Sequence, residues 1–121
     1  MSLRSYMRAT KPLGNVHEKG SAITQTMTMT EIVSYTPAEG EVFRLTKIVG
    51  AFPTANLVEL LIAGEVKHTY AQAPYSTLID WFPWGDEYKL VGDGSKKVTI
   101  RAQAFTSGGY TCHAEIIGHK E

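Results

Sequence analysis

Polar and apolar residues alternate with a period of two through most of the chain after residue 20, as they do in β-strands that bury one face. The longest alternating run covers residues 23–33. It places one set of side chains (Thr24, Thr26, Thr28 and Thr30) opposite another (Ile23, Met27, Met29 and Val33). Threonine-rich alternation predicts a half-buried strand there. Further strands are predicted at residues 41–49, 57–64, 66–70, 77–82, 87–91, 98–105 and 110–118.

About eight short strands, separated by turn residues at intervals of about 8–12 positions, are typical of an antiparallel β-sandwich or small barrel. We therefore expect an all-β, jelly-roll-like sandwich. The Asp93–Gly94 pair and the Ser-Gly-Gly stretch at 107–109 predict two hairpins, which would join the last three strands in succession. The predicted core faces of the last two strands comprise Val98, Ile100, Ala102 and Ala104, and Tyr110, Cys112, Ala114 and Ile116.

Residues 1–20 show neither the apolar periodicity of a helix nor that of a strand, and they contain Pro12 and Gly14. We therefore expect an extended N-terminal arm followed by a sandwich domain at residues 21–121. The arm has four basic residues and one acidic residue, whereas the rest of the chain has eight basic and eleven acidic residues. A basic arm can attach to the acidic body of a neighbouring copy, with Arg4, Arg8 and Lys11 as the candidate contacts. The alternative is a tail that only improves solubility.

The overall composition argues against several classes of function. A chain of 121 residues is the size of one domain, and twelve basic residues balance twelve acidic ones. Nucleic-acid binding requires a basic surface, and this balance favours neither nucleic acid nor an anionic membrane as a partner. No apolar stretch is long enough for a membrane span, and the N-terminus has no signal-peptide core. The single cysteine, Cys112, is expected to be a buried, unreactive thiol.

No catalytic motif is present, and we expect neither an enzyme nor a cofactor. The sequence has no nucleophile elbow, no zinc-protease motif and no phosphate-binding loop. His113 and Glu115 would share one face of the last strand, about 7 Å apart, but no motif supplies a third metal ligand. A group of acids could approach one another at one end of a sandwich and hold calcium, although their spacing matches no EF-hand loop: Asp80, Asp86, Glu87 and Asp93.

The stretch WFPWGDEY, residues 81–88, contains four of the twelve aromatic residues. Pro83 ends a strand or lies on a sheet edge, because it has no amide hydrogen to donate. One tryptophan is then expected to pack in the core or at a corner, and the other, Trp84, to be partly exposed. An exposed ring can bind a neighbouring protein or stack on a sugar, and the candidate residues are Tyr75, Trp84 and Tyr110. We favour a corner and protein interface over a sugar platform.

The segments GEVFRLTKIVGAF, NLVELLIAGEV and YKLVGDGSKKVTIRAQA, followed by a last strand ending in EIIG, form a rhythm of strands and turns over residues 40–118. This rhythm resembles small jelly-roll virion proteins, such as decoration or minor capsid proteins of tailed phages and archaeal viruses. The resemblance implies a non-enzymatic cement role in a virion, with copies of the protein or a major capsid protein as partners. It transfers no functional residues. The alternative is a carbohydrate-binding β-sandwich module with a glycan ligand, while a cupin-type enzyme is disfavoured because the four histidines are scattered.

Overall fold

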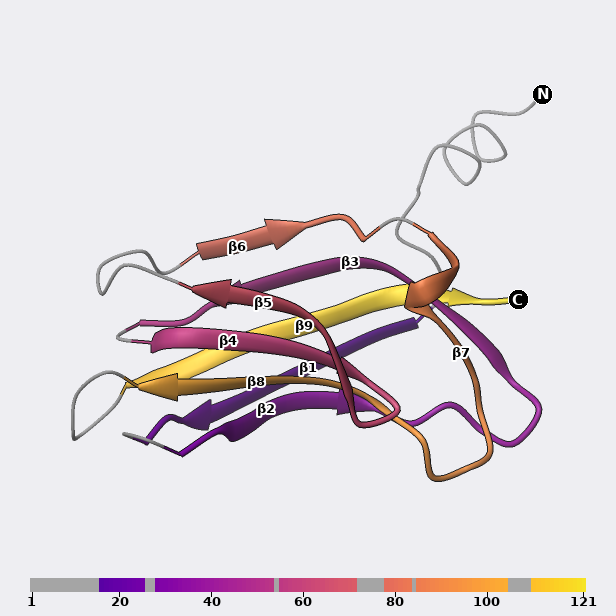
Figure 1. Cartoon of the computed structure of the whole chain (residues 1–121), viewed down its shortest axis with the longest axis horizontal. Helices are drawn as coiled ribbons and strands as arrows, with labels where there is room; N and C mark the ends of the chain where they lie inside the picture. The colour runs from indigo at the N-terminus through magenta and orange to yellow at the C-terminus, as the bar shows by residue number, and fades with distance from the viewer. Residues whose placement is uncertain (1–15, 26–27, 54, 72–77, 84, 105–109) are drawn as a thin grey trace.

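Two antiparallel sheets form the described part of the chain in the computed structural model (Figure 1). The structure describes residues 16–25, 28–53, 55–71, 78–83, 85–104 and 110–121. Their strands are β1 (Val16–Ile23), β2 (Thr30–Tyr35), β3 (Val42–Ala51), β4 (Ala55–Ile62), β5 (Glu65–Ala71), β6 (Leu78–Trp81), β7 (Lys89–Val91), β8 (Val98–Ala104) and β9 (Thr111–Lys120), with a short 3₁₀ helix at Asp86–Tyr88.

The strand order is that of a jelly roll. The first sheet runs β1-β9-β3-β6, with β7 also paired to β3, and the second sheet runs β2-β8-β4-β5. Because β6 and β7 both pair with β3, they act as one interrupted edge strand, and each sheet has four strand positions. Strands that follow one another in sequence mostly lie in opposite sheets, so the chain winds around the core. The predicted all-β, jelly-roll-like sandwich is confirmed.

Both predicted hairpins are wrong, because β7 and β9 lie in the first sheet while β8 lies in the second. Asp93–Gly94 is a genuine turn, but it carries the chain from one sheet to the other. The strong hairpin is instead formed by β4 and β5, where Ala63 and Gly64 have φ values of 53° and 83°. Two consecutive residues with positive φ form the type I′ turn that matches the twist of paired strands.

The strand predicted at residues 23–33 is also wrong, because β1 ends at Ile23 and β2 begins at Thr30 in the other sheet. At the end of β1, the apolar Ile23 is 61% exposed and the following Thr24 is 1% exposed. Threonine has both a methyl and a hydroxyl group and therefore suits a buried or an exposed face. Its alternation along the sequence does not determine which face is buried.

Alternation also fails in β3, which contains a bulge between Leu45 and Lys47. One extra residue shifts the side chains that follow to the opposite face of the sheet. Ile48 therefore faces the core, 2% exposed, whereas Lys47, two residues after the buried Leu45, pairs with Asp80 at 3.4 Å.

The sandwich begins earlier than predicted. Strand β1 pairs with β9 continuously from Val16 to Ile23, so residues 16–20 belong to the first sheet rather than to an arm. Edge strands are commonly polar, and this polarity concealed the strand in the sequence. The remainder of the predicted arm, residues 1–15, lies outside the described residues.

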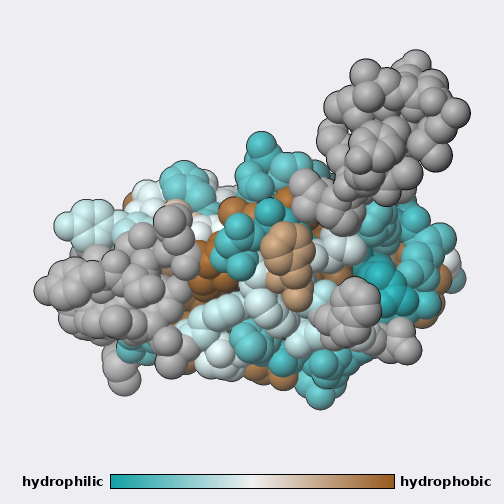
Figure 2. Space-filling model, turned by 90° about the horizontal axis from the view of Figure 1, so that it is seen from above, coloured by the Kyte–Doolittle hydropathy of each residue, from teal (hydrophilic) through white to brown (hydrophobic). Residues whose placement is uncertain are grey.

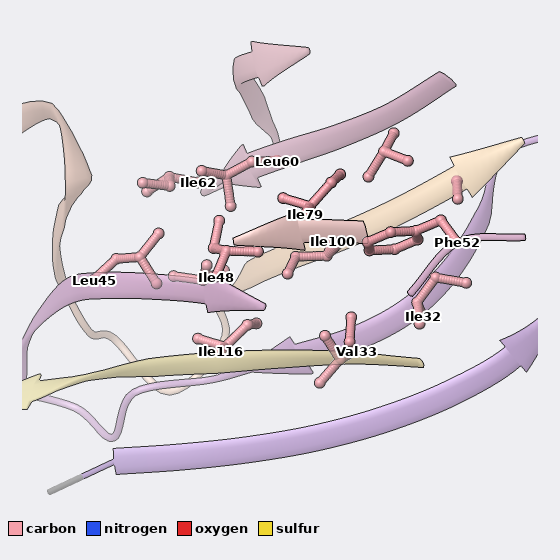
Figure 3. Packing of buried hydrophobic residues seen from close by; sticks show 14 of the residues in the cluster. Ile32, Val33, Leu45, Ile48, Phe52, Leu60, Ile62, Ile79, Ile100 and Ile116 are labelled. Carbon is pink, nitrogen blue, oxygen red and sulfur yellow. The ribbon is translucent and has the colours of Figure 1, made fainter. Parts of the chain in front are cut away.

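The core lies between the two sheets (Figure 3). The predicted inward face of β8 is confirmed, since Val98, Ile100, Ala102 and Ala104 are each at most 1% exposed. On β9, Cys112, Ala114 and Ile116 are buried as predicted, but Tyr110 is 62% exposed because it precedes the strand. Burial raises the pKa of the Cys112 thiol, which favours the unreactive form. The described residues contain no helix of the length and apolarity required to cross a membrane.

Candidate interaction site at the open edge of the sandwich

The aromatic stretch at residues 81–88 interrupts the edge strand of the first sheet. Trp81 of β6 pairs with Ile48, and Lys89 of β7 pairs with Arg44. Seven residues, 82–88, therefore stand opposite only three residues of β3, and the chain must leave the sheet between the two pairs. Gly85 turns the chain with a φ of 111°, and the amide of Tyr88 donates to the Gly85 carbonyl at 3.3 Å. The predicted corner is thus an excursion from the edge strand.

Aromatic rings bridge the two sheets at this edge. His68 and Tyr70 come from β5, at the edge of the second sheet, and Trp81 comes from β6 in the first sheet. The His68 and Trp81 rings stack, with centroids 4.4 Å apart and an angle of 15° between planes. Tyr70 and Tyr88 each meet Trp81 edge to face, at 5.8 and 5.3 Å. We call these four residues the ring cluster.

The ring cluster is closely packed. The Tyr70 hydroxyl is buried and has no hydrogen-bond partner among the described residues. Burial raises the pKa of Tyr70 and of Tyr88, because an ionised phenolate would lose its hydration. Both groups are therefore neutral at physiological pH. The predicted core or corner role for one tryptophan is met by Trp81, which packs against the core.

Apolar surface lies immediately outside the ring cluster. Phe82 is 57% exposed, and the Lys47 ammonium lies 4.8 Å from the centre of its ring. Lys47 also pairs with Asp80 at 3.4 Å. Figure 2 looks down on the β6 side of the sandwich and shows apolar surface in the middle of this face, with polar surface around it. An aromatic side chain framed by charged groups is the usual composition of a protein-binding surface.

Of the six residues singled out from the sequence, only one is described. Tyr110 is 62% exposed, and its carbonyl accepts a hydrogen bond from the Thr24 amide at 3.5 Å. Nearby Ile23 is also exposed. Arg4, Arg8, Lys11, Tyr75 and Trp84 lie outside the described residues, so the structure does not place them relative to Tyr110.

Three of the charged residues considered as metal ligands have other partners. Glu115 pairs with His17 at 3.0 Å and with Lys19 at 3.7 Å. Asp80 pairs with Lys47, and Asp93 binds its own turn. Within the described part of the chain, no group of three or more metal-binding side chains comes together.

Sequence patterns did not reveal the contact between His68 and Trp81. Each residue lies in a correctly predicted strand, but the pairing depends on which strands form the edges of the two sheets. Alternation placed one of Trp81 and Phe82 in the core, but it gave no contact between Trp81 and His68. A comparison with known protein families, curated proteins and solved structures finds no match to this chain.

Proposed function

We propose that this protein is a non-enzymatic structural subunit that assembles with copies of itself or decorates a larger particle. The observation that supports this function best is apolar exposure along one edge of the first sheet. Phe82, which follows β6, is 57% exposed, and Val91 at the end of β7 is 59% exposed. Single exposed apolar residues are common on monomers, but two along the same interrupted edge strand favour an interaction surface.

This edge suits contact through side chains better than addition of a strand. β6 has four residues and β7 has three, and residues 82–88 separate them. Short and interrupted edge strands offer few main-chain groups for pairing with another sheet. Phe82, with Lys47 and Asp80 beside it, instead provides an aromatic anchor with a charged border, the composition of interface hot spots.

The N-terminal segment supplies a second proposed contact, argued from sequence alone. Residues 1–15 contain three basic residues, Arg4, Arg8 and Lys11, and no acidic residue. Residues 16–121 contain nine basic and twelve acidic residues. Opposite charges favour attachment of this segment to the body of a neighbour and speed the encounter.

A role as a decoration or minor capsid protein of a virion is the more specific form of this proposal. The jelly-roll strand order supports it, since this architecture is frequent in capsid proteins. Lectin domains share the architecture, however, so the fold does not by itself choose between particle assembly and sugar binding. The proposed partners are further copies of the chain and a major capsid protein.

Light scattering tests the assembly proposal directly. We expect the full chain to form a multimer, and we expect its mass to fall towards that of a monomer in Phe82→Ser and after deletion of residues 1–15. Ile23→Ser is the matched control, because Ile23 is 61% exposed at the end of β1, the other edge strand of the first sheet. A full-length chain that stays monomeric at high concentration would contradict self-assembly. If Phe82→Ser leaves the multimer mass unchanged, the β6–β7 edge is not part of the interface.

Carbohydrate binding is the second candidate function, and the exposure of Tyr110 favours it. An aromatic ring with one face open to solvent can stack on a sugar. Tyr110→Ala and Trp84→Ala should then each abolish binding on a glycan screen without changing the multimer mass. If the unmodified chain binds no glycan, this candidate is eliminated.

A further inference from the structure

The connection between β7 and β8 contains the one position in the sequence where aspartate or asparagine precedes glycine, Asp93–Gly94. Residues 93–97 are exposed and carry the chain from the first sheet to the second. Glycine has no side chain to shield its main-chain nitrogen. The nitrogen of Gly94 is therefore sterically open to the side chain that precedes it.

The Asp93 carboxylate is held by its own turn. Its Oδ1 atom accepts hydrogen bonds from the Ser95 amide, the Ser95 hydroxyl and the Lys96 amide, each at 2.8 Å. Gly94 has a φ of 86°, which glycine adopts without strain. Three donors on one carboxylate oxygen form a closed turn of four residues, 93–96, which we call the Asp93 turn.

We propose that Asp93–Gly94 is the chain's site of spontaneous isomerisation from aspartate to isoaspartate, and that the Asp93 turn suppresses this reaction in the folded protein. The reaction does not depend on the proposed assembly, and it limits the chemical lifetime of a connection between the two sheets.

The reaction needs only water. The Gly94 nitrogen loses its proton and attacks Cγ of Asp93, so that a carbon–nitrogen bond forms and one carboxyl oxygen leaves as water. The resulting five-membered succinimide is then opened by a water molecule at either carbonyl carbon. One opening restores aspartate, and the other leaves the main chain running through Cγ as isoaspartate. The composition of the chain is unchanged, and nothing is oxidised or reduced.

The Asp93 turn opposes the first step in two ways. Cγ is attacked most readily when the carboxyl group is protonated. The hydrogen bonds from Lys96 and Ser95 lower the pKa of Asp93 to about 2, so the protonated fraction at neutral pH is smaller than that of an ordinary aspartate. Ring closure also removes the negative charge that the three donors bind. The charge-assisted hydrogen bonds must therefore weaken before the ring can form.

Isomerisation would disturb a connection that is anchored at both ends. The Gly92 amide donates to the Glu41 carbonyl at 2.7 Å, and the Lys97 carbonyl accepts from the Ala63 amide at 3.0 Å. A Cβ atom on Gly92 would lie 2.3 Å from the Ala38 carbonyl oxygen, so the backbone there has no room to shift. Isoaspartate adds a methylene group to the main chain between these anchors and would disrupt the Asp93 turn.

Peptide mapping after incubation of the full-length protein at neutral pH tests the inference, because isoaspartate changes peptide retention without changing mass. We expect isoaspartate at residue 93 to accumulate roughly tenfold more slowly in the folded chain than in the same chain in urea. Ser95→Ala, which removes one of the three donors, should accelerate the reaction in the folded chain by about fivefold. Lys96→Ala is the matched control, because it retains the amide donor and should leave the rate close to that of the unmodified chain.

Each possible result of this experiment tests a different part of the proposal. Equal rates in the folded and urea-unfolded chains would refute suppression by the fold, and unchanged accumulation in Ser95→Ala would refute the role of the Asp93 turn. Isoaspartate that accumulates first at another residue would refute the assignment of the site. Thermal unfolding of each variant before incubation shows whether the chain is folded. If Ser95→Ala is not, Ser95→Thr, which retains a hydroxyl donor, should react at the rate of the unmodified chain.

Discussion

Single residues determine how closely the two sheets approach. At Gly20 of β1, a Cβ atom would lie 2.3 Å from the Ile32 carbonyl oxygen and 2.9 Å from Cβ of Val33. The backbones of β1 and β2 are therefore nearly in contact, and only glycine fits. At the opposite edge the sheets are bridged by the ring cluster, where the Tyr70 hydroxyl is buried without a partner among the described residues. A buried, unpaired hydroxyl destabilises the folded state relative to the solvated unfolded chain.

Tyr70→Phe should therefore stabilise the protein, by about 1 kcal/mol, because it removes the unpaired hydroxyl and preserves the ring contacts with His68 and Trp81. Urea unfolding measures the difference. Tyr35→Phe is the matched control, since the Tyr35 hydroxyl donates to Glu41 and its loss should destabilise by about 1 kcal/mol. Destabilisation by Tyr70→Phe would mean that the hydroxyl has a partner in the folded protein.

At the scale of strands and turns, the β4–β5 hairpin contains a residue under strain. Ala63 has a φ of 53°, a conformation that asparagine and glycine adopt more readily. Ala63→Asn should stabilise the protein by about 0.5–1 kcal/mol, because asparagine is favoured at this position of a type I′ turn. Thermal unfolding measures this gain. Gly64→Ala, at a φ of 83°, should destabilise the protein. Stabilisation by both variants would contradict the turn assignment.

Most strands could be predicted from the sequence, whereas their pairing could not. A nearly continuous apolar run located β4. Alternation located β8, because the apolar residues of that strand face the core. It failed where one residue was added, as in the β3 bulge at Leu45–Lys47, and where an edge strand was polar, as in β1. Local turn residues indicated that the chain reverses after Val91. Whether the chain then forms a hairpin or crosses to the other sheet depends on how the apolar faces of the two sheets are buried against each other. The ring cluster depends on that choice and was therefore inaccessible to sequence reasoning.

In the whole molecule, the two long sides of the sandwich are closed by different means. β1 and β2 meet through their backbones at Gly20, whereas β5 and β6 are held by stacking of His68 on Trp81 and by the edge contacts of Tyr70. The contact at Gly20 is made by the backbone, so no side-chain truncation can remove it. A ring cluster depends on each ring, since β5 and β6 belong to different sheets and no strand pairing joins these two strands. We therefore expect the β5–β6 side to open first when the protein is perturbed.

Trp81→Ala tests this asymmetry. The variant should lose about 3 kcal/mol of unfolding free energy, because it leaves a cavity between the sheets and removes two edge-to-face contacts and one stacked contact. Phe82→Ala is the matched control: the next ring in the sequence is mostly exposed, so its removal should change stability by less than about 0.5 kcal/mol. Amide hydrogen exchange gives the decisive comparison. In Trp81→Ala, protection should fall in β5 and β6 while β1 and β2 retain theirs. Equal loss of protection on both sides would mean that the sandwich opens as one unit and that the ring cluster is not an independent closure.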